Sequence, residues 1–325
     1  MTGRFLHAIA ASVLVAAASA PVAAREPARA AADGPRMRSA AVLVMDQETR
    51  EVLYSKNEDA VVPIASITKL MTALVTLDAS LPLDEEITIT KADLAIAGGS
   101  RARSSLRSGV TLTRRDLLRL ALMSSENRAA AALGRSYPGG LEAFVEAMNA
   151  RAQLIGMSDS RFIEPTGLSP ENVSSAGDLV RLVEASARQP LIREYSTASS
   201  HEVRIGKRKV AYRNTNRLVS SPSWAIGVQK TGFIRAAGRC LVMQANIAAR
   251  PLVIVLLDSV GKYTRIGDAN RLRTWLEDSL GVEGADGGVR RPDPVWAANA
   301  RTAYDSGSRY GSRVRVQFPS PTSYW

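Results

Sequence analysis

The chain has 325 residues, of which 46% are hydrophobic and 22% are charged, the composition of a globular protein with one large domain or two small ones. Its two histidines and single cysteine are too few for a usual zinc site, and a Ser-His-Asp triad would depend on His201 alone because His7 lies in a predicted leader. The formal net charge of +11 suits nucleic acid, an anionic membrane surface or an anionic cell-wall polymer, or it merely keeps the surface solvated.

The first residues predict a secretory signal peptide. Arg4 supplies a positive charge, residues 5–18 form an apolar stretch, and residues 22–24 form a small-residue cleavage pattern. We therefore expect a cleaved signal peptide over residues 1–24, a linker over 25–37 and a periplasmic location, which argues against nucleic acid as a partner. No stable membrane anchor is expected, because the apolar stretch is shorter than the roughly 20 residues of a spanning helix and no cysteine follows it for lipid attachment.

The segments after the leader alternate between strand and helix patterns. Apolar runs at residues 39–45 and 51–54, joined by a polar turn, predict a β-hairpin. Apolar residues at helical spacing after Pro63 predict a buried helix with Ser66 at its N-terminus. A second helical region spans residues 113–133, with Thr113 and Asp116 spaced as a capping box and Ser125 interrupting it.

The remaining segments define the fold class. Helical patterns at residues 141–154 and 177–187 make the stretch from about 81 to 193 mostly helical, as expected for an inserted subdomain. Strands follow at residues 203–213, 224–232, 239–248 and 252–258, and a helix follows at 268–280. Strands at both ends with helices between them predict an α/β fold, in which helices flank an antiparallel sheet built from the chain termini.

The last segment, residues 281–325, is rich in Gly, Pro, Ser and Arg and shows no helical period. It is expected to be a flexible basic tail. A membrane-surface helix is the alternative, but no apolar face lies opposite the arginines.

The string Ser66-Ile67-Thr68-Lys69 predicts a serine nucleophile whose base is lysine. Lys69 lies one helical turn after Ser66, so its amine can reach the serine hydroxyl. A desolvated lysine near a second cation has a lowered pKa and can take the serine proton, and Lys230 is the candidate second cation. This chemistry needs neither a metal nor a cofactor. A lone Ser-Xaa-Xaa-Lys is a weak signal, and its surroundings must support it.

Two further strings supply that support, Ser125-Glu126-Asn127 and Lys230-Thr231-Gly232. Ser125 can relay a proton to a leaving amine, and the Asn127 amide can hold a substrate carbonyl. Lys230 and Thr231 can bind the carboxylate that follows the scissile bond, while the adjacent glycine, Gly232, admits the substrate backbone. The backbone N–H groups of Ser66 and Phe233 are the candidate oxyanion hole.

These three motifs occur in the same order in penicillin-binding proteins and serine β-lactamases. Over residues 38–280 the chain resembles the low-molecular-mass D-alanyl-D-alanine peptidases, and its endopeptidase branch most closely. The resemblance is carried by these strings: Pro63-Ile64-Ala65-Ser66-Ile67-Thr68-Lys69-Leu70-Met71-Thr72, Ala121-Leu122-Met123-Ser124-Ser125-Glu126-Asn127-Arg128-Ala129-Ala130-Ala131, Glu164-Pro165-Thr166-Gly167-Leu168-Ser169 and Lys230-Thr231-Gly232-Phe233.

The resemblance implies a DD-peptidase catalytic domain over residues 38–280 that forms an acyl-enzyme on Ser66. Its substrates would be peptidoglycan peptides, with β-lactam antibiotics as acylating inhibitors. Glu126 would mark the endopeptidase branch, which cuts D-Ala–diaminopimelate cross-links. Three alternatives stay open: a D-alanyl-D-alanine carboxypeptidase, a serine β-lactamase and a noncatalytic wall-binding protein.

Overall fold

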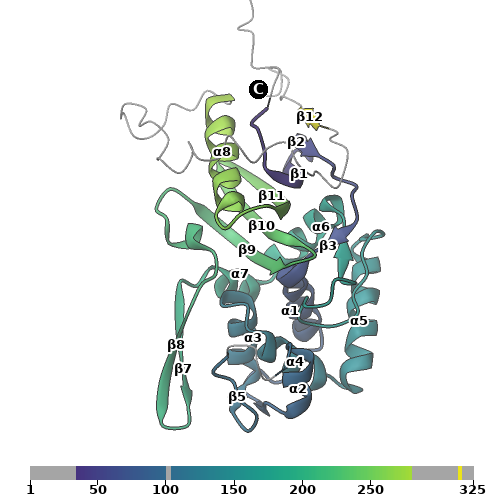
Figure 1. The fold of residues 1–325 in the computed structure, drawn as a ribbon, viewed down its shortest axis with the longest axis vertical. Coiled ribbons are helices and arrows are strands. Elements are labelled where there is room, and N and C mark those ends of the chain that lie inside the picture. The colour runs from purple at the N-terminus through teal and green to yellow at the C-terminus, as the bar shows by residue number, and fades with distance from the viewer. Residues whose placement is uncertain (1–33, 100–103, 280–313, 317–325) are drawn as a thin grey trace, which may run out of the picture. The chain divides into compact units, whose positions relative to one another are not determined.

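The structure is a computed structural model that describes residues 34–99, 104–279 and 314–316 (Figure 1). The predicted signal peptide over residues 1–24 lies outside the described residues, as does most of the segment 281–325. The described part of the chain belongs to one compact unit. The division into linker, catalytic domain, inserted subdomain and tail therefore stays a prediction.

The centre of this unit is an antiparallel sheet with strand order β12-β2-β1-β11-β10-β9. Its strands are β1 (Ser39–Asp46), β2 (Val52–Lys56), β9 (Ala225–Ile234), β10 (Gly238–Ile247), β11 (Arg250–Ser259) and β12 (Val314–Val316). β1 pairs with both β2 and β11, with Val42 opposite Leu256. The predicted sheet built from both ends of the chain is therefore confirmed.

The shorter strands form separate two-stranded sheets. They pair β3 (Val62–Pro63) with β6 (Val173–Ser174), β4 (Glu86–Thr88) with β5 (Thr111–Thr113), and β7 (Ser200–Ile205) with β8 (Arg208–Arg213). The α-helices are α1 (Thr68–Asp78), α2 (Lys91–Ile96), α3 (Arg114–Met123), α4 (Asn127–Arg135), α5 (Gly140–Leu154), α6 (Ala176–Ala187), α7 (Pro190–Thr197) and α8 (Thr264–Ser279). Two 3₁₀ turns, η1 (Ala65–Ile67) and η2 (Arg217–Ser220), complete the described elements.

Both faces of the central sheet are covered by helices. Alternate residues of each strand point to opposite faces, so neighbouring residues of β1 belong to different apolar clusters. Ala41 and Leu43 of β1 pack with α1 and α6 in one apolar cluster. Val42 and Val44 pack in a second cluster with α8, which lies on the other face (Figure 1). The central strands therefore read as continuous apolar runs.

Three details differ from the sequence-based expectations. Residues 203–213, expected to form one strand, contain the end of β7, a turn and the whole of β8, since Gly206, at φ 58°, permits the tight turn between the two strands. Ser66 lies in the 3₁₀ turn that precedes α1 rather than in the first α-helical turn. Within residues 281–325, the described strand β12 pairs with β2, which the composition of that segment did not predict.

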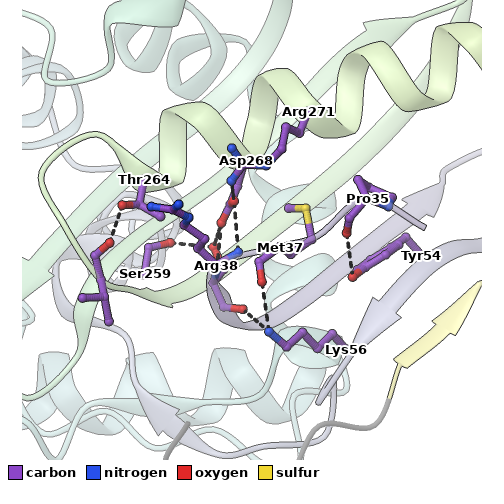
Figure 2. Close-up of polar contacts among 11 residues, drawn as sticks. Pro35, Met37, Arg38, Tyr54, Lys56, Ser259, Thr264, Asp268 and Arg271 are labelled. Atoms are coloured by element: carbon purple, nitrogen blue, oxygen red, sulfur yellow. Dashed lines mark hydrogen bonds and ion pairs between the residues drawn. The ribbon is translucent and has the colours of Figure 1, made fainter. Parts of the chain in front are cut away.

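Helix α8 is fastened to the start of β1 by the buried carboxylate of Asp268 (Figure 2). That carboxylate accepts hydrogen bonds from the Arg38 N–H at 3.1 Å, the Ser39 N–H at 2.8 Å and the Ser39 hydroxyl at 2.6 Å, and it also pairs with Arg271. Close by, the Lys56 amine donates to the Ser39 carbonyl at 2.9 Å. These polar contacts hold α8 and β2 against the start of β1.

No described helix combines the length and the apolar character that crossing a membrane requires.

Candidate active site

The predicted nucleophile, Ser66, lies in the η1 turn beside β9, the last strand in the sheet order. Ala65, the residue before it, has a positive φ of 49°, which few L-residues adopt. The Thr68 hydroxyl holds the Ala65 carbonyl at 2.8 Å, and the Asn172 side chain holds the Thr68 hydroxyl at 3.1 Å. Ser66 itself is 9% exposed. The turn therefore presents one serine hydroxyl from an otherwise buried segment.

Two glycines let neighbouring backbone pack directly against this turn. A Cβ on Gly167 would lie 2.0 Å from the Ala65 carbonyl oxygen, and a Cβ on Gly232 would lie 2.9 Å from the Ile64 carbonyl oxygen. Neither space admits a side chain. The same Gly232 Cβ would lie 3.2 Å from the Ser66 nitrogen, so strand β9 runs beside the nucleophile.

Lys69, one turn into the helical segment, is fully buried and its amine makes three polar contacts. These are to the Ser66 hydroxyl at 2.8 Å, the Asn127 side-chain oxygen at 2.7 Å and the Thr166 carbonyl at 2.5 Å. Burial lowers the pKa of Lys69 to about 7, although the charges of Glu164 and Glu126 act to raise it. An appreciable fraction of this amine is therefore uncharged near neutral pH.

The contact geometry suits an uncharged amine that accepts the serine proton. The Asn127 side-chain oxygen and the Thr166 carbonyl oxygen can only accept hydrogen bonds, so they take the two N–H bonds of a neutral amine. The Lys69 amine lies 2.8 Å from the Ser66 hydroxyl, so a neutral amine whose two N–H bonds are taken in this way has its lone pair left for the serine proton. This arrangement can perform general base chemistry without histidine.

Ser125 is brought to the site by the turn between α3 and α4. The helix α3 ends where the N–H groups of Ser124 and Glu126 both bond the Leu120 carbonyl at 3.1 Å. Ser125 between them takes a positive φ of 61°, which ends the helical path. Its hydroxyl accepts a hydrogen bond from the Lys230 amine at 2.9 Å.

Lys230 lies in β9 and is also fully buried. Burial, together with the positive charges of Lys69 and Arg265, holds the pKa of Lys230 well below its usual value. Its amine donates to the Ser125 hydroxyl and to the Thr231 carbonyl, both at 2.9 Å. This amine therefore links the third motif, to which Lys230 belongs, with Ser125 of the second motif.

Thr231 and the backbone of Gly232 are held by residues outside the three motifs. The Thr231 hydroxyl lies 2.6 Å from the hydroxyl of Thr215. The Arg265 guanidinium donates to the Gly232 carbonyl at 2.7 Å and to the Cys240 carbonyl of the neighbouring strand at 3.2 Å. No motif marked Thr215 or Arg265, since each reaches the site only through the packing of distant segments.

The two candidate oxyanion donors come from the adjoining segments already described. Ser66 belongs to η1, and Phe233 follows Gly232 in β9, which runs beside that turn. The Phe233 side chain is 55% exposed, so it takes no part in the core. Its backbone N–H is the group that the sequence analysis assigned.

Glu164 holds the loop that carries the Thr166 carbonyl. Its carboxylate accepts hydrogen bonds from the N–H groups of Thr166 and Gly167 at 2.6 Å, from the Ser169 N–H at 3.3 Å and from the Asn172 side chain at 3.1 Å. A carboxylate with these donors is a structural anchor rather than a base for a hydrolytic water. This occupancy argues against the β-lactamase alternative.

His201 and Cys240 lie outside this cluster. The His201 ring contacts Asp116 at 3.0 Å and Arg119 at 3.3 Å. Cys240 is buried in β10, and burial raises the pKa of its thiol to about 12, so it is a poor nucleophile. The described residues contain no group of three or more His, Cys, Asp or Glu side chains arranged to hold a metal ion.

Sequence comparisons identify the family of this chain. The chain matches the S11 peptidase family, described as D-alanyl-D-alanine carboxypeptidase, over residues 28–261. It is 52% identical over 243 residues to the D-alanyl-D-alanine endopeptidase of Pseudomonas aeruginosa, covering 74% of this chain and 78% of that relative. It is 46% identical over 269 residues to the D-alanyl-D-alanine endopeptidase of Escherichia coli, covering 82% of this chain and 86% of that relative.

A solved structure shows the same fold. The Streptomyces K15 DD-transpeptidase matches with a TM-score of 0.70 at 27% identity, covering 75% of this chain and 98% of that one. Family, fold and the cluster of Ser66, Lys69, Ser125 and Lys230 therefore agree. This chain belongs to the S11 family of serine D-alanyl-D-alanine peptidases.

Proposed function

We propose that this DD-peptidase is a periplasmic endopeptidase that hydrolyses D-Ala–diaminopimelate cross-links of peptidoglycan through an acyl-enzyme on Ser66. The observation that carries the mechanism is the contact between the buried Lys69 amine, whose pKa is about 7, and the Ser66 hydroxyl. The narrower endopeptidase assignment is supported by relatives of that name at 52% and 46% identity. The periplasmic location is inferred from the predicted signal peptide.

Acylation begins when the neutral Lys69 amine takes the Ser66 proton and the serine oxygen attacks the carbonyl carbon of D-alanine. The N–H groups of Ser66 and Phe233 stabilise the oxygen that becomes negative. The peptide C–N bond then breaks, and the proton passes from Lys69 to the leaving amine with Ser125 as relay. The products of this step are a free amine and an ester on Ser66.

Deacylation repeats the same proton transfers with water. Lys69 takes a proton from a water molecule, the resulting hydroxide attacks the ester carbonyl, and the ester C–O bond breaks. Lys69 returns the proton to the Ser66 oxygen, and the D-alanyl peptide leaves with a free carboxylate. The enzyme is restored with no net change in its protons.

Substrate binding is assigned to the third motif and to Asn127. Lys230 and Thr231 bind the carboxylate that follows the scissile bond, and the negative charge of that carboxylate acts to raise the pKa of Lys230, which burial lowers. The Asn127 amide N–H group can hold a substrate carbonyl, since its oxygen already contacts Lys69. A β-lactam has a strained amide followed by a carboxylate, so it is expected to acylate Ser66 at the same place.

Digestion of purified peptidoglycan fragments tests this function. Cross-linked muropeptide dimers and pentapeptide monomers are incubated separately with the enzyme, and the products are resolved by mass. We expect dimer cleavage without loss of terminal D-alanine from the monomers. Release of D-alanine from monomers alone would establish the carboxypeptidase alternative.

The nucleophile is tested with Ser66→Ala and a fluorescent penicillin. We expect labelling and hydrolysis to fall by a factor of about 1,000 or more, since the covalent intermediate cannot form. Thermal unfolding near the wild-type temperature serves as the control for folding. Unchanged labelling would show that penicillin reacts with another residue and that Ser66 is not the nucleophile.

A further inference from the structure

The β7–β8 hairpin, residues 200–213, is a strongly basic segment that the proposed mechanism does not use. Five of its fourteen residues are cationic and one is anionic, which gives a net charge of +4, with histidine neutral, within the +11 of the whole chain. The cations are Arg204, Lys207, Arg208, Lys209 and Arg213. Figure 1 shows the hairpin projecting from the body of the molecule, with its turn at the far end.

Most of these cations are exposed and lack an acidic partner. Lys209 pairs with Glu202 at 2.9 Å. The other four are exposed, and none forms an ion pair with an acidic side chain that the structure describes. Arginines of the helical part, such as Arg114 and Arg135, are instead paired with carboxylates. The hairpin therefore offers positive charge that the rest of the described chain does not neutralise.

Two of the cations lie directly opposite each other. Arg204 of β7 faces Lys209 of β8 in the strand register. Like charges in directly opposite positions destabilise a strand pair, and the single carboxylate of Glu202 offsets only part of this repulsion. A negative ligand bound along this face would remove the repulsion, so the face favours an anion.

The base of the hairpin is joined to the reaction centre through Thr215. Its N–H donates to the carbonyl of Met123, which ends α3 two residues before Ser125, at 3.1 Å. Its hydroxyl lies 2.6 Å from the hydroxyl of Thr231 in the third motif. A ligand lying along the hairpin can therefore be continuous with a ligand in the site.

The length of the hairpin determines which ligands can reach both places. β7 has six residues, and a rise of about 3.3 Å per residue puts the turn roughly 20 Å from the base. Penicillin or a short peptide bound at Ser66 does not span this distance, whereas a polymer does. Peptidoglycan, the proposed substrate, is such a polymer, and its uncross-linked peptides end in carboxylates. Its charge is complementary to that of the hairpin.

A lipid surface fits the hairpin less well. Segments that lie on membranes combine cations with exposed aromatic or aliphatic side chains that enter the bilayer. The large apolar side chains exposed on the described residues, such as Phe233 and Tyr263, lie outside the hairpin, and Val203 within it is buried. The hairpin thus has the charge for an anionic partner but no apolar group for insertion.

We propose that the β7–β8 hairpin binds carboxylates of the peptidoglycan polymer at a distance from the cross-link that the site cuts. This inference rests on the proposed function, because it concerns the same polymeric substrate. Arg204, Lys207 and Arg208, near the turn, are the binding side chains. Polymer held there raises the effective concentration of cross-links at Ser66, so intact peptidoglycan is cut more efficiently than a short soluble peptide.

Sedimentation with insoluble peptidoglycan measures this binding in a Ser66→Ala background, which prevents turnover. A hairpin variant and a control variant each lose three exposed cations. The hairpin variant carries Arg204→Gln, Lys207→Gln and Arg208→Gln, and the control carries Arg36→Gln, Lys91→Gln and Arg188→Gln, outside the hairpin and the site. We expect Kd to rise about tenfold in the hairpin variant, the combined effect of three exposed ion pairs, and less than about twofold in the control. Equal Kd values in the two variants would overturn the inference.

Turnover with Ser66 restored separates this inference from the proposed function. The rate on intact peptidoglycan, divided by the rate on a short soluble cross-linked peptide, should fall about tenfold in the hairpin variant while penicillin labelling and thermal unfolding stay near wild type. Arg204→Lys with Arg208→Lys keeps the charge and should keep the ratio. An unchanged ratio in the hairpin variant excludes the hairpin site alone, whereas failure of the wild type to cut the soluble peptide excludes the endopeptidase function.

Vesicles containing phosphatidylglycerol test the lipid alternative with the same two variants. Loss of peptidoglycan binding by the hairpin variant, with vesicle binding equal in the two variants, would support the polymer as the partner. A hairpin variant that loses vesicle binding but keeps peptidoglycan binding would overturn the inference and assign the hairpin to a membrane surface.

Discussion

Two lysines, Lys69 and Lys230, are buried in one site, and this pairing sets its chemistry at the scale of residues. Removing an ammonium group from water favours the uncharged amine, and a second amine nearby strengthens that effect. Lys230 experiences both influences, while the carboxylates of Glu164 and Glu126 partly offset the burial of Lys69. Lys69 is thereby poised near neutral pH.

This balance predicts how the acylation rate depends on pH. The base form of Lys69 is the neutral amine, which makes up about one tenth of the population at pH 6 and about nine tenths at pH 8 for a pKa of about 7. The second-order rate of labelling by a fluorescent penicillin should therefore rise through pH 7. A rate that stays flat or falls between pH 6 and pH 8 would contradict this assignment.

A substitution checks the same residue at constant pH. Lys69→Arg keeps a long cationic side chain but cannot lose its proton at pH 8. We expect penicillin labelling to fall by a factor of about 1,000 while Ser66 remains in place. Labelling at a rate comparable to wild type would show that another group takes the serine proton.

At the scale of elements, the η1 turn is shaped by backbone packed against it. A Cβ at Gly167 would meet the Ala65 carbonyl at 2.0 Å. Gly140 has nearly the same φ, 79° against 78°, but a Cβ there would meet nothing within 4 Å. These two glycines separate the effect of the clash from the effect of the backbone conformation.

Gly167→Ala should displace the Ala65–Ser66 backbone and lower activity by a factor of about 100 or more. Unfolding by urea should show a loss of more than about 2 kcal/mol, against about 1 kcal/mol for Gly140→Ala, which carries only the strain of its positive φ. Activity should stay near wild type in the Gly140 variant. Equal losses of activity in the two variants would show that the close packing at Ser66 is unimportant.

The attachment of α8 to β1 is a second test at this scale. Asp268 is fully buried and accepts several hydrogen bonds from the start of β1, whereas Asp278 of the same helix is exposed. Asp268→Asn should lower the free energy of unfolding by roughly 2 to 4 kcal/mol, because it replaces a paired buried acceptor with a mismatched amide. Asp278→Asn should lie within about 0.5 kcal/mol of wild type. Similar unfolding curves for both variants would contradict the role of Asp268 as a fastening residue.

At the scale of the whole molecule, stability is expected to be uneven. β10 and β11 pair along their lengths and are buried on both faces, so their amide protons are sheltered. The hairpin of β7 and β8 forms a separate two-stranded sheet, and many of its residues are exposed. A local opening that leaves the central sheet intact is therefore possible.

Native-state hydrogen exchange measures this difference directly. Amides of β10 and β11 should exchange only through global unfolding, with the same free energy as denaturant unfolding. Amides of the β7–β8 hairpin should exchange by local opening at a lower free energy, by about 2 kcal/mol or more. One common exchange free energy for both regions would show that the hairpin unfolds together with the sheet.

The elements that could be predicted from sequence are those whose own residues determine them. The buried helix after Pro63, the break at Ser125 and the three long C-terminal strands follow from apolar period and turn residues, and they are confirmed. The sequence pattern predicts one strand over residues 203–213, where the structure has a hairpin over residues 200–213, because one glycine at a turn is a weak local signal. The pairing of β12 with β2 had no signal, since three residues carry too little pattern.

By itself, the sequence determined the reactive residue types and their order along the chain, because the three motifs need only short spacings to be recognised. Only the tertiary structure decided that Lys69 contacts Thr166, that Thr215 meets Thr231 and that Arg265 braces Gly232. Such contacts depend on how whole elements pack, and packing is a property of the complete fold rather than of any local segment.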